Sequence, residues 1–174
     1  MKKIIIGMIA LILVTGCGKN DVEKEEKFYN SLESSYVSIY ATDGVGLAVY
    51  DQESTEINGV TWYKVANSKY NKMSTLVNMT ENVYTEDVYT KIEDEIGKKY
   101  KEIDGEFYTT SSGGCTLKYQ LTEELSDNLK KDIKDLKISG SKATFKYDGK
   151  EYKAKLVGDY YQFSEKIFKC VEDK

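Results

Sequence analysis

The first seventeen residues determine which part of the chain is left to fold. Met1-Lys2-Lys3 precedes an apolar stretch at 4–14, and Thr15-Gly16-Cys17 follows it, an order typical of a secretory signal peptide. The apolar stretch would span roughly 16 Å as a helix, whereas a membrane-spanning helix needs ~20 residues. We therefore expect an export signal and no permanent membrane span.

The end of this segment, Val14-Thr15-Gly16-Cys17, matches a lipobox. Small residues admit the signal peptidase, and the Cys17 thiol takes a diacylglyceryl group whose acyl chains, palmitate for example, anchor the protein stably. Two alternatives are an ordinary secreted protein with an accidental cysteine and an uncleaved anchor. We expect a lipoprotein signal peptide at 1–16, a polar lipidated tether at 17–23 and a single domain at 24–174.

The composition of the remaining chain limits the functions that it can have. Without residues 1–16 the formal net charge falls from −4 to −6, which argues against nucleic acid as a partner. The absence of histidine excludes Ser-His and Cys-His catalysis and zinc-hydrolase chemistry. Paired carboxylates could run a glycosidase, but some of 29 acidic residues will lie close together by chance. We expect no enzyme, no metal and no cofactor.

Two further cysteines, Cys115 and Cys170, form an even pair once Cys17 is assigned to lipid. An oxidising compartment favours a disulfide between them. Two free buried thiols and a nucleophilic thiol at Cys115 are the alternatives, and no base accompanies the latter.

Apolar spacing predicts helices in the first half of the chain. The expected helices cover 24–41, 73–84 and a segment that Thr85 starts and caps. Short strands are expected at 47–50 and 60–65, with Asn58-Gly59 as the turn before the second of these.

The second half of the chain has the pattern of strands. Strands are expected at 100–103, 107–108, 115–121, 143–147, 152–156 and 160–163, with a short helix from Thr122 to about Lys131. Asp104-Gly105 and Asp148-Gly149 supply hairpin turns. We predict one α+β domain, in which N-terminal helices pack on a C-terminal antiparallel β-sheet.

The order of these local features resembles that of the IseA-type inhibitors of cell-wall DL-endopeptidases. The matching pieces are Asn58-Gly59-Val60-Thr61-Trp62-Tyr63, the helix around 73–83, Tyr84-Thr85-Glu86-Asp87, Asp104-Gly105-Glu106-Phe107-Tyr108 and Gly113-Gly114. The sequence departs from that family in its lipobox and in the Cys115 and Cys170 pair.

The resemblance implies a protein that binds an NlpC/P60-type peptidase outside a Gram-positive-type cell. Together with the lipobox, it predicts a location on the outer face of the cytoplasmic membrane, facing the cell wall. Glu86, Asp87, Asp104 and Tyr108 are the partner-binding candidates. An alternative is a lipoprotein that holds a small ligand in a cone-shaped fold resembling nuclear transport factor 2, and a third is a structural or adhesive wall component. The 15 tyrosines and Trp62 could also form a carbohydrate-stacking or protein-binding face. Most of the tyrosines, however, alternate along strands as core residues do.

Overall fold

The computed structural model describes residues 17–110 and 114–171. The predicted signal peptide at 1–16, and Gly113 of the predicted glycine loop, lie outside the described residues. Four helices and eight strands follow one another along the chain: α1 Cys17–Thr42, β1 Val49–Ile57, β2 Val60–Val65, α2 Met73–Val83, α3 Glu86–Lys99, β3 Tyr100–Ile103, β4 Glu106–Thr110, α4 Leu125–Asp132, β5 Lys134–Ser139, β6 Lys142–Tyr147, β7 Lys150–Val157 and β8 Tyr160–Phe163.

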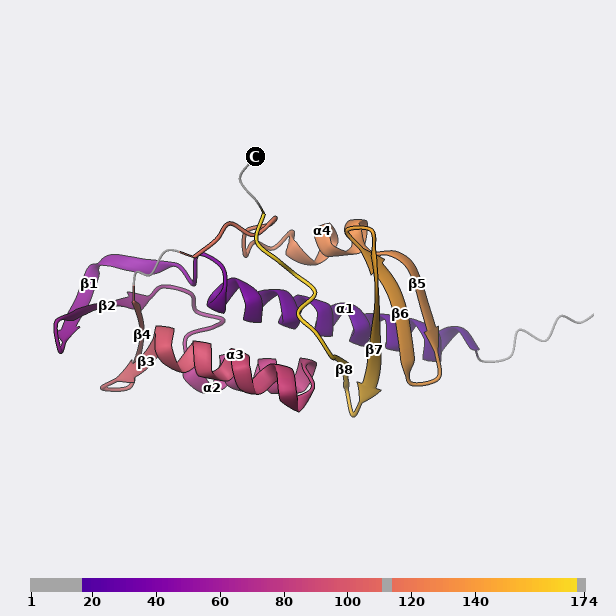
Figure 1. Ribbon diagram of the computed structural model, residues 1–174, viewed down its shortest axis with the longest axis horizontal. Coiled ribbons are helices and arrows are strands. Elements are labelled where there is room, and N and C mark those ends of the chain that lie inside the picture. Colours follow the sequence, from indigo (N-terminus) through magenta and orange to yellow (C-terminus); the bar gives the residue numbers. More distant parts are fainter. Residues whose placement is uncertain (1–16, 111–113, 172–174) are drawn as a thin grey trace, which may run out of the picture.

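The α+β class is confirmed, but the strands form two antiparallel sheets instead of one. The first sheet has the order β1-β2-β4-β3 and the second β5-β6-β7-β8. Figure 1 shows the two sheets at opposite ends of the molecule, with α1 running lengthwise between them, α2 and α3 along one side of α1 and α4 along the other. The prediction of a single C-terminal sheet is wrong, because β2 pairs with β4 across more than forty residues. Local patterning does not specify a contact between such distant segments.

Helix α1 contributes more residues to the core cluster than any other element. The predicted stripe of Phe28, Leu32, Tyr36, Ile39 and Tyr40 is buried. The helix begins at Cys17, so the expected tether at 17–23 is helical. Glutamate and lysine favour this conformation intrinsically, and Lys27 pairs with Glu23 one turn earlier at 3.1 Å.

The second sheet packs on α1 through aromatic side chains. Phe28 lies edge-to-face against Phe145 and Tyr161, with ring centroids 5.0 and 5.6 Å apart. Such contacts add roughly 0.5–1.5 kcal/mol each to the burial of apolar area. One continuous core cluster joins both sheets to the helices, which fits a single domain.

The turns follow the predictions. Asn58-Gly59, Asp104-Gly105 and Asp148-Gly149 all have positive φ at both residues, as the tight turns of twisted hairpins require.

The strand expected at 115–121 is absent, apart from one bridge between Gly44 and Cys115. The Tyr36 hydroxyl accepts the N–H of Tyr119 at 2.6 Å and donates to its carbonyl at 2.7 Å. A side chain of α1 thereby takes the two backbone groups that a neighbouring strand would use. Strand β5 was not predicted, because it offers only Leu136 and Ile138 as apolar signal.

Candidate functional site

The four predicted partner-binding residues lie in two separate places. Glu86 and Asp87 form the first turn of α3, whereas Asp104 and Tyr108 belong to the β3–β4 hairpin that follows its far end. Helix α3 has 14 residues, which corresponds to about 21 Å. The structure therefore places Asp104 and Tyr108 in one hairpin. Glu86 and Asp87 lie apart from them, at the opposite end of α3.

The start of α3 has a structural explanation for its carboxylates. Thr85 occupies the position before the helix, but its hydroxyl makes no capping bond to a backbone N–H and donates to Asp87 Oδ1 at 2.7 Å. The expected cap is therefore wrong in its chemistry, although right in its place. Glu86 and Asp87 lie where the positive end of the helix dipole stabilises negative charge.

A shallow depression of about 730 Å³ lies at this helix start. It is lined by Thr85, Glu86, Asp87, Thr90 and Lys91, and most of its boundary is open to solvent. Small-ligand sites are more enclosed than this. The depression therefore gives no support to a ligand-holding site.

A more distinctive arrangement lies on the outer face of the first sheet, which points away from the core. The register places Lys64, Tyr108 and Lys101 in one row across β2, β4 and β3, and Thr55, Trp62 and Thr110 in the next. These six residues define the outer face of the first sheet. The other face carries the core residues Tyr100 and Phe107.

Trp62 is the centre of this outer face. Only 9% of its surface is exposed, yet it does not belong to the core cluster, so its neighbours on the outer face cover it. The Lys101 ammonium lies 5.3 Å from its ring centroid, a cation–π contact that holds the lysine flat on the sheet. Half-buried Tyr108 lies in register between Lys101 and Lys64.

The lysines of this face are occupied by contacts within the protein. Lys64 bridges Glu53 of β1 at 3.1 Å and Glu106 of β4 at 3.4 Å. The hydrogen bond to Glu53 raises the pKa of Lys64. Because both lysines are already engaged within the protein, a partner would meet chiefly the negative charge of the surrounding carboxylates.

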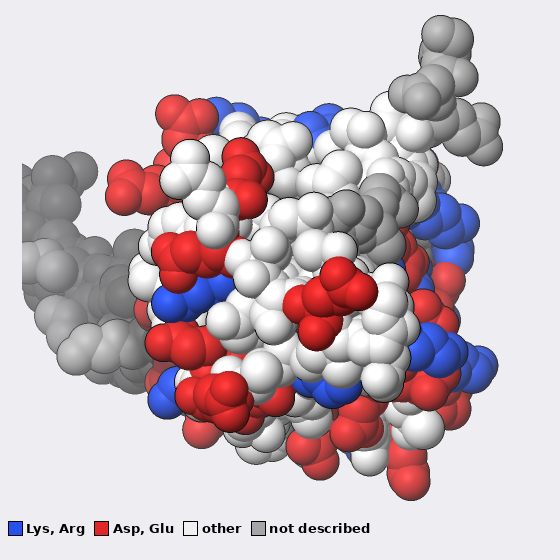
Figure 2. All heavy atoms as spheres, turned by 90° about the vertical axis from the view of Figure 1, so that its left-hand side faces the viewer, with Lys and Arg blue, Asp and Glu red and all other residues white. Residues whose placement is uncertain are grey.

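The surrounding surface is acidic on balance. Residues 49–110 hold 12 acidic residues against 7 lysines. Figure 2 shows this end of the molecule as a broad uncharged area on which acidic side chains are more prominent than lysines. An acidic surround of this kind favours encounter with a basic partner.

The sequence alone predicted Tyr108 and Asp104 as site residues but did not assign a role to Trp62, Lys64 or Lys101. The alternation Trp62-Tyr63-Lys64-Val65 in β2 was a usable signal, because it separates the residues of the two sheet faces. What the pattern lacked was the pairing of β2 with β4, which places Trp62 beside the β3–β4 hairpin.

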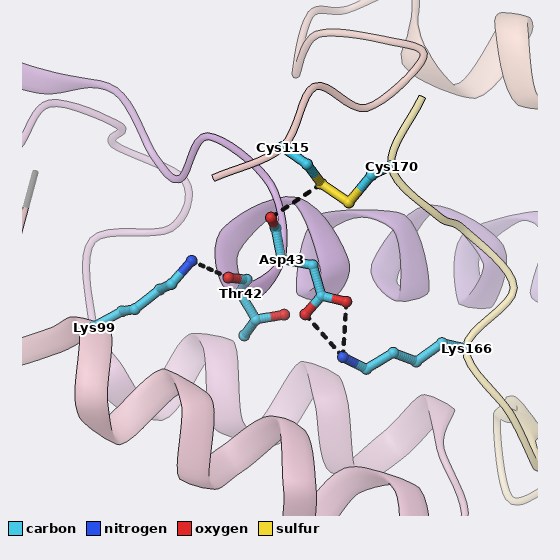
Figure 3. Close-up of a disulfide and its surroundings, with 6 residues drawn as sticks. All are labelled: Thr42, Asp43, Lys99, Cys115, Lys166 and Cys170. Atoms are coloured by element: carbon cyan, nitrogen blue, oxygen red, sulfur yellow. Dashed lines mark hydrogen bonds and ion pairs between the residues drawn. A yellow bond between two sulfur atoms is a disulfide. The ribbon is translucent and has the colours of Figure 1, made fainter. Parts of the chain in front are cut away.

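A set of contacts around the end of α1, which we call the clasp, joins segments that are far apart in the sequence: Thr42, Asp43, Lys99, Cys115, Lys166 and Cys170. Cys115 and Cys170 form a disulfide with Cα atoms 5.4 Å apart. Asp43 lies at the centre of the clasp (Figure 3): its carbonyl accepts the Cys115 N–H at 3.0 Å, and its carboxylate pairs with Lys166 at 2.8 Å. Lys99 donates to the Thr42 carbonyl at the helix end.

Comparison with known proteins adds no family: no protein-family model and no curated protein matches this sequence. Within residues 17–110 and 114–171, no cluster of three or more His, Cys, Asp or Glu side chains has the geometry of a metal site. None of the helices described there combines the length and hydrophobicity needed to cross a membrane.

Proposed function

We propose that this chain is a lipoprotein, anchored through a diacylglyceryl group on Cys17 to the outer face of the cytoplasmic membrane, that binds and inhibits a cell-wall DL-endopeptidase of the NlpC/P60 type. The observation that carries the binding role is the outer face of the first sheet, where half-buried Tyr108 lies beside the covered Trp62 within an acidic surround. Tryptophan and tyrosine are the residues that most often dominate the energy of protein interfaces.

The position of this face suits a partner in the cell wall. Helix α1 has 26 residues, about 39 Å from end to end. Cys17 begins the helix, and the first sheet lies at the opposite end of the molecule (Figure 1). A domain tethered at Cys17 therefore presents the first sheet away from the anchor.

The chemistry required of an inhibitor is modest. Blocking a peptidase cleft requires a rigid complementary surface and no catalytic group. The four-stranded sheet, its satisfied lysines and the clasp at Asp43 supply rigidity. The disulfide suits a protein that works outside the cytoplasm.

The small-ligand alternative finds less support in the core. Its cavity would have to be lined by strand tyrosines such as Tyr152 and Tyr161. Tyr152 stacks on Phe145 with centroids 5.6 Å apart, and Tyr161 packs against Phe28. These side chains fill the space between the second sheet and α1.

The proposal is tested by peptidoglycan digestion with an NlpC/P60-type endopeptidase in the presence of residues 17–174 carrying Cys17→Ser. All described core residues lie between Phe28 and Phe168, so this soluble chain keeps the whole core. We expect saturable inhibition and a complex that survives size-exclusion chromatography.

Tyr108→Ala is expected to weaken inhibition at least tenfold, about 1.4 kcal/mol, because a central aromatic anchor is lost. Tyr160→Ala, at an exposed tyrosine of the second sheet, is the matched control and should inhibit like the parent. Equal effects of both substitutions would assign inhibition to another surface, and no inhibition by the parent would refute the proposed function.

A further inference from the structure

The outer face of the second sheet is strongly basic, although the whole chain is acidic. Six lysines project from it along three neighbouring strands, and we name this set the basic face: Lys134, Lys137, Lys142, Lys146, Lys153 and Lys155. All six are exposed, whereas their strand neighbours Ala143, Phe145, Tyr152 and Ala154 face the core. Residues 134–157 contain 7 lysines and 3 acidic residues, the reverse of the balance at the other end of the molecule.

The arrangement places like charges directly opposite one another. Lys142 faces Lys155, and Lys134 faces Lys146. Cross-strand pairs of like charge destabilise a sheet. Lysines often protect edge strands from aggregation, but Lys142 and Lys155 lie on β6 and β7, the two inner strands of this sheet, so edge protection does not explain their pairing.

Neutralisation within the protein is slight. Lys146 pairs with Asp135 at 2.8 Å. In the described part of the chain, Lys137, Lys142, Lys153 and Lys155 form no ion pair with a carboxylate. Like charges that face one another without internal neutralisation are typical of a functional surface. On this surface, the neutralising negative charge would come from a partner.

An apolar pair extends the same face. Val157 and Tyr160 lie opposite each other in the register of β7 and β8, two residues beyond Lys155. They are 47% and 38% exposed. Tyrosine and an aliphatic residue beside lysines match the region where lipid headgroups meet acyl chains.

The hairpin that carries this apolar pair is tied to α1. Asp159, at the tip between Val157 and Tyr160, pairs with Lys27 at 2.8 Å. From Lys27 the helix continues to Cys17 for ten residues, about 15 Å. Figure 1 shows the second sheet and the N-terminal part of α1 at the same end of the molecule, so this sheet is close to the proposed anchor.

We infer that the basic face is a second membrane contact, which binds the phosphate headgroups of anionic phospholipids while Val157 and Tyr160 enter the interfacial layer. Each lysine near an anionic bilayer raises partitioning by about fivefold. The inference rests on the proposed anchor only for the location of the membrane. The face itself recognises headgroups without the lipid, and one attached lipid together with basic residues gives firmer attachment than either alone.

Sedimentation with vesicles tests the inference on residues 17–174 carrying Cys17→Ser. Vesicles of phosphatidylcholine with about one third phosphatidylglycerol should bind the protein at low salt and release it as salt rises. Vesicles of phosphatidylcholine alone should not bind it. Absence of binding to the anionic vesicles would overturn the inference.

Charge reversal locates the contact. Lys153→Glu with Lys155→Glu should lower anionic-vesicle binding by more than 20-fold, since two contacts of about fivefold each are lost and two repulsions are added. Lys91→Glu with Lys98→Glu on exposed positions of α3 makes the same change in net charge and should leave binding within twofold. Equal losses in both variants would show that net charge, and not the basic face, governs binding.

Tyr160→Ala distinguishes a membrane from a soluble phosphate polymer. It should weaken vesicle binding severalfold, because an interfacial side chain is removed. Binding that is insensitive to Tyr160→Ala and is competed fully by poly(glycerol phosphate) would assign the face to a polymer and overturn the membrane inference. Peptidase inhibition is measured separately, so a domain that inhibits but ignores vesicles would refute only this inference, and the converse result only the proposed function.

Discussion

Removal of the Cys115–Cys170 disulfide should lower the stability of the domain by about 4 kcal/mol. The two cysteines are 55 residues apart in sequence, and the chain-entropy relation gives about 14 cal/mol/K for a loop of that length, or about 4 kcal/mol at 25 °C. Typical domains are stable by only about 5–15 kcal/mol, so the double variant Cys115→Ser with Cys170→Ser should be marginal.

Some contacts of the clasp persist without the disulfide. Val171 donates to the Thr116 carbonyl at 2.8 Å, and Lys166 still pairs with Asp43. These contacts act in the folded state, whereas the disulfide acts mainly by restricting the unfolded chain. We therefore expect folding to survive and the loss to appear in full in the free energy of unfolding.

Urea denaturation followed by circular dichroism measures the effect. With an m-value of about 2 kcal/mol/M, the midpoint should fall by about 2 M. Cys17→Ser in both proteins removes the third thiol and keeps the comparison clean. A midpoint shift below about 0.5 M would refute the entropic reasoning and imply that the unfolded chain keeps this loop closed by other means.

Three further perturbations separate the energetics of the sheets and the clasp. Lys155→Glu should raise the free energy of unfolding by about 0.2–1 kcal/mol in urea denaturation, because it turns the repulsive pair with Lys142 into an attractive one. Gly114→Ala should cost at least about 2 kcal/mol, or prevent accumulation of folded protein, because its Cβ would lie 1.6 Å from the Gly44 carbonyl oxygen. Burial raises the pKa of Tyr100 to about 12, so the unfolded chain loses this proton first and stability should fall by about 2 kcal/mol between pH 10 and pH 12. In alkaline denaturation curves, Tyr100→Phe should reduce the pH dependence of the free energy of unfolding by the contribution of one titrating proton.

The sequence predicted the parts of the fold that depend on neighbouring residues. The three Gly-containing hairpin turns and the buried stripe of α1 follow from local conformational preference and helical period. The division into two sheets did not, because the β2–β4 pairing joins distant segments. The segment at 115–121 looked like a strand, but the Tyr36 hydroxyl takes its hydrogen-bonding groups, and no periodicity reports such a replacement.

The candidate site could be predicted only in part, because it also depends on the pairing of distant strands. Tyr108 was named because it belongs to the Asp104-Gly105-Glu106-Phe107-Tyr108 piece of the resemblance, whereas Trp62 lay in another such piece and was assigned no site role. The basic face was equally present in the sequence as alternating lysines on β6 and β7. It went unnoticed because lysine is abundant throughout the chain, and only the register shows that lysines of adjacent strands face one another.

The length of α1 makes the two charged ends of the molecule independent. The helix spans about 39 Å, whereas charges in physiological salt are screened over about 8 Å. An anionic membrane at the basic face therefore exerts almost no force on the acidic surround of Trp62, which remains free to attract a basic partner. Substitutions at the two ends should accordingly act additively: Lys155→Glu should alter vesicle binding without altering inhibition, and Tyr108→Ala should do the reverse. A rigid helix with a contact surface at each end can thus hold the proposed anchor and the proposed partner at the same time.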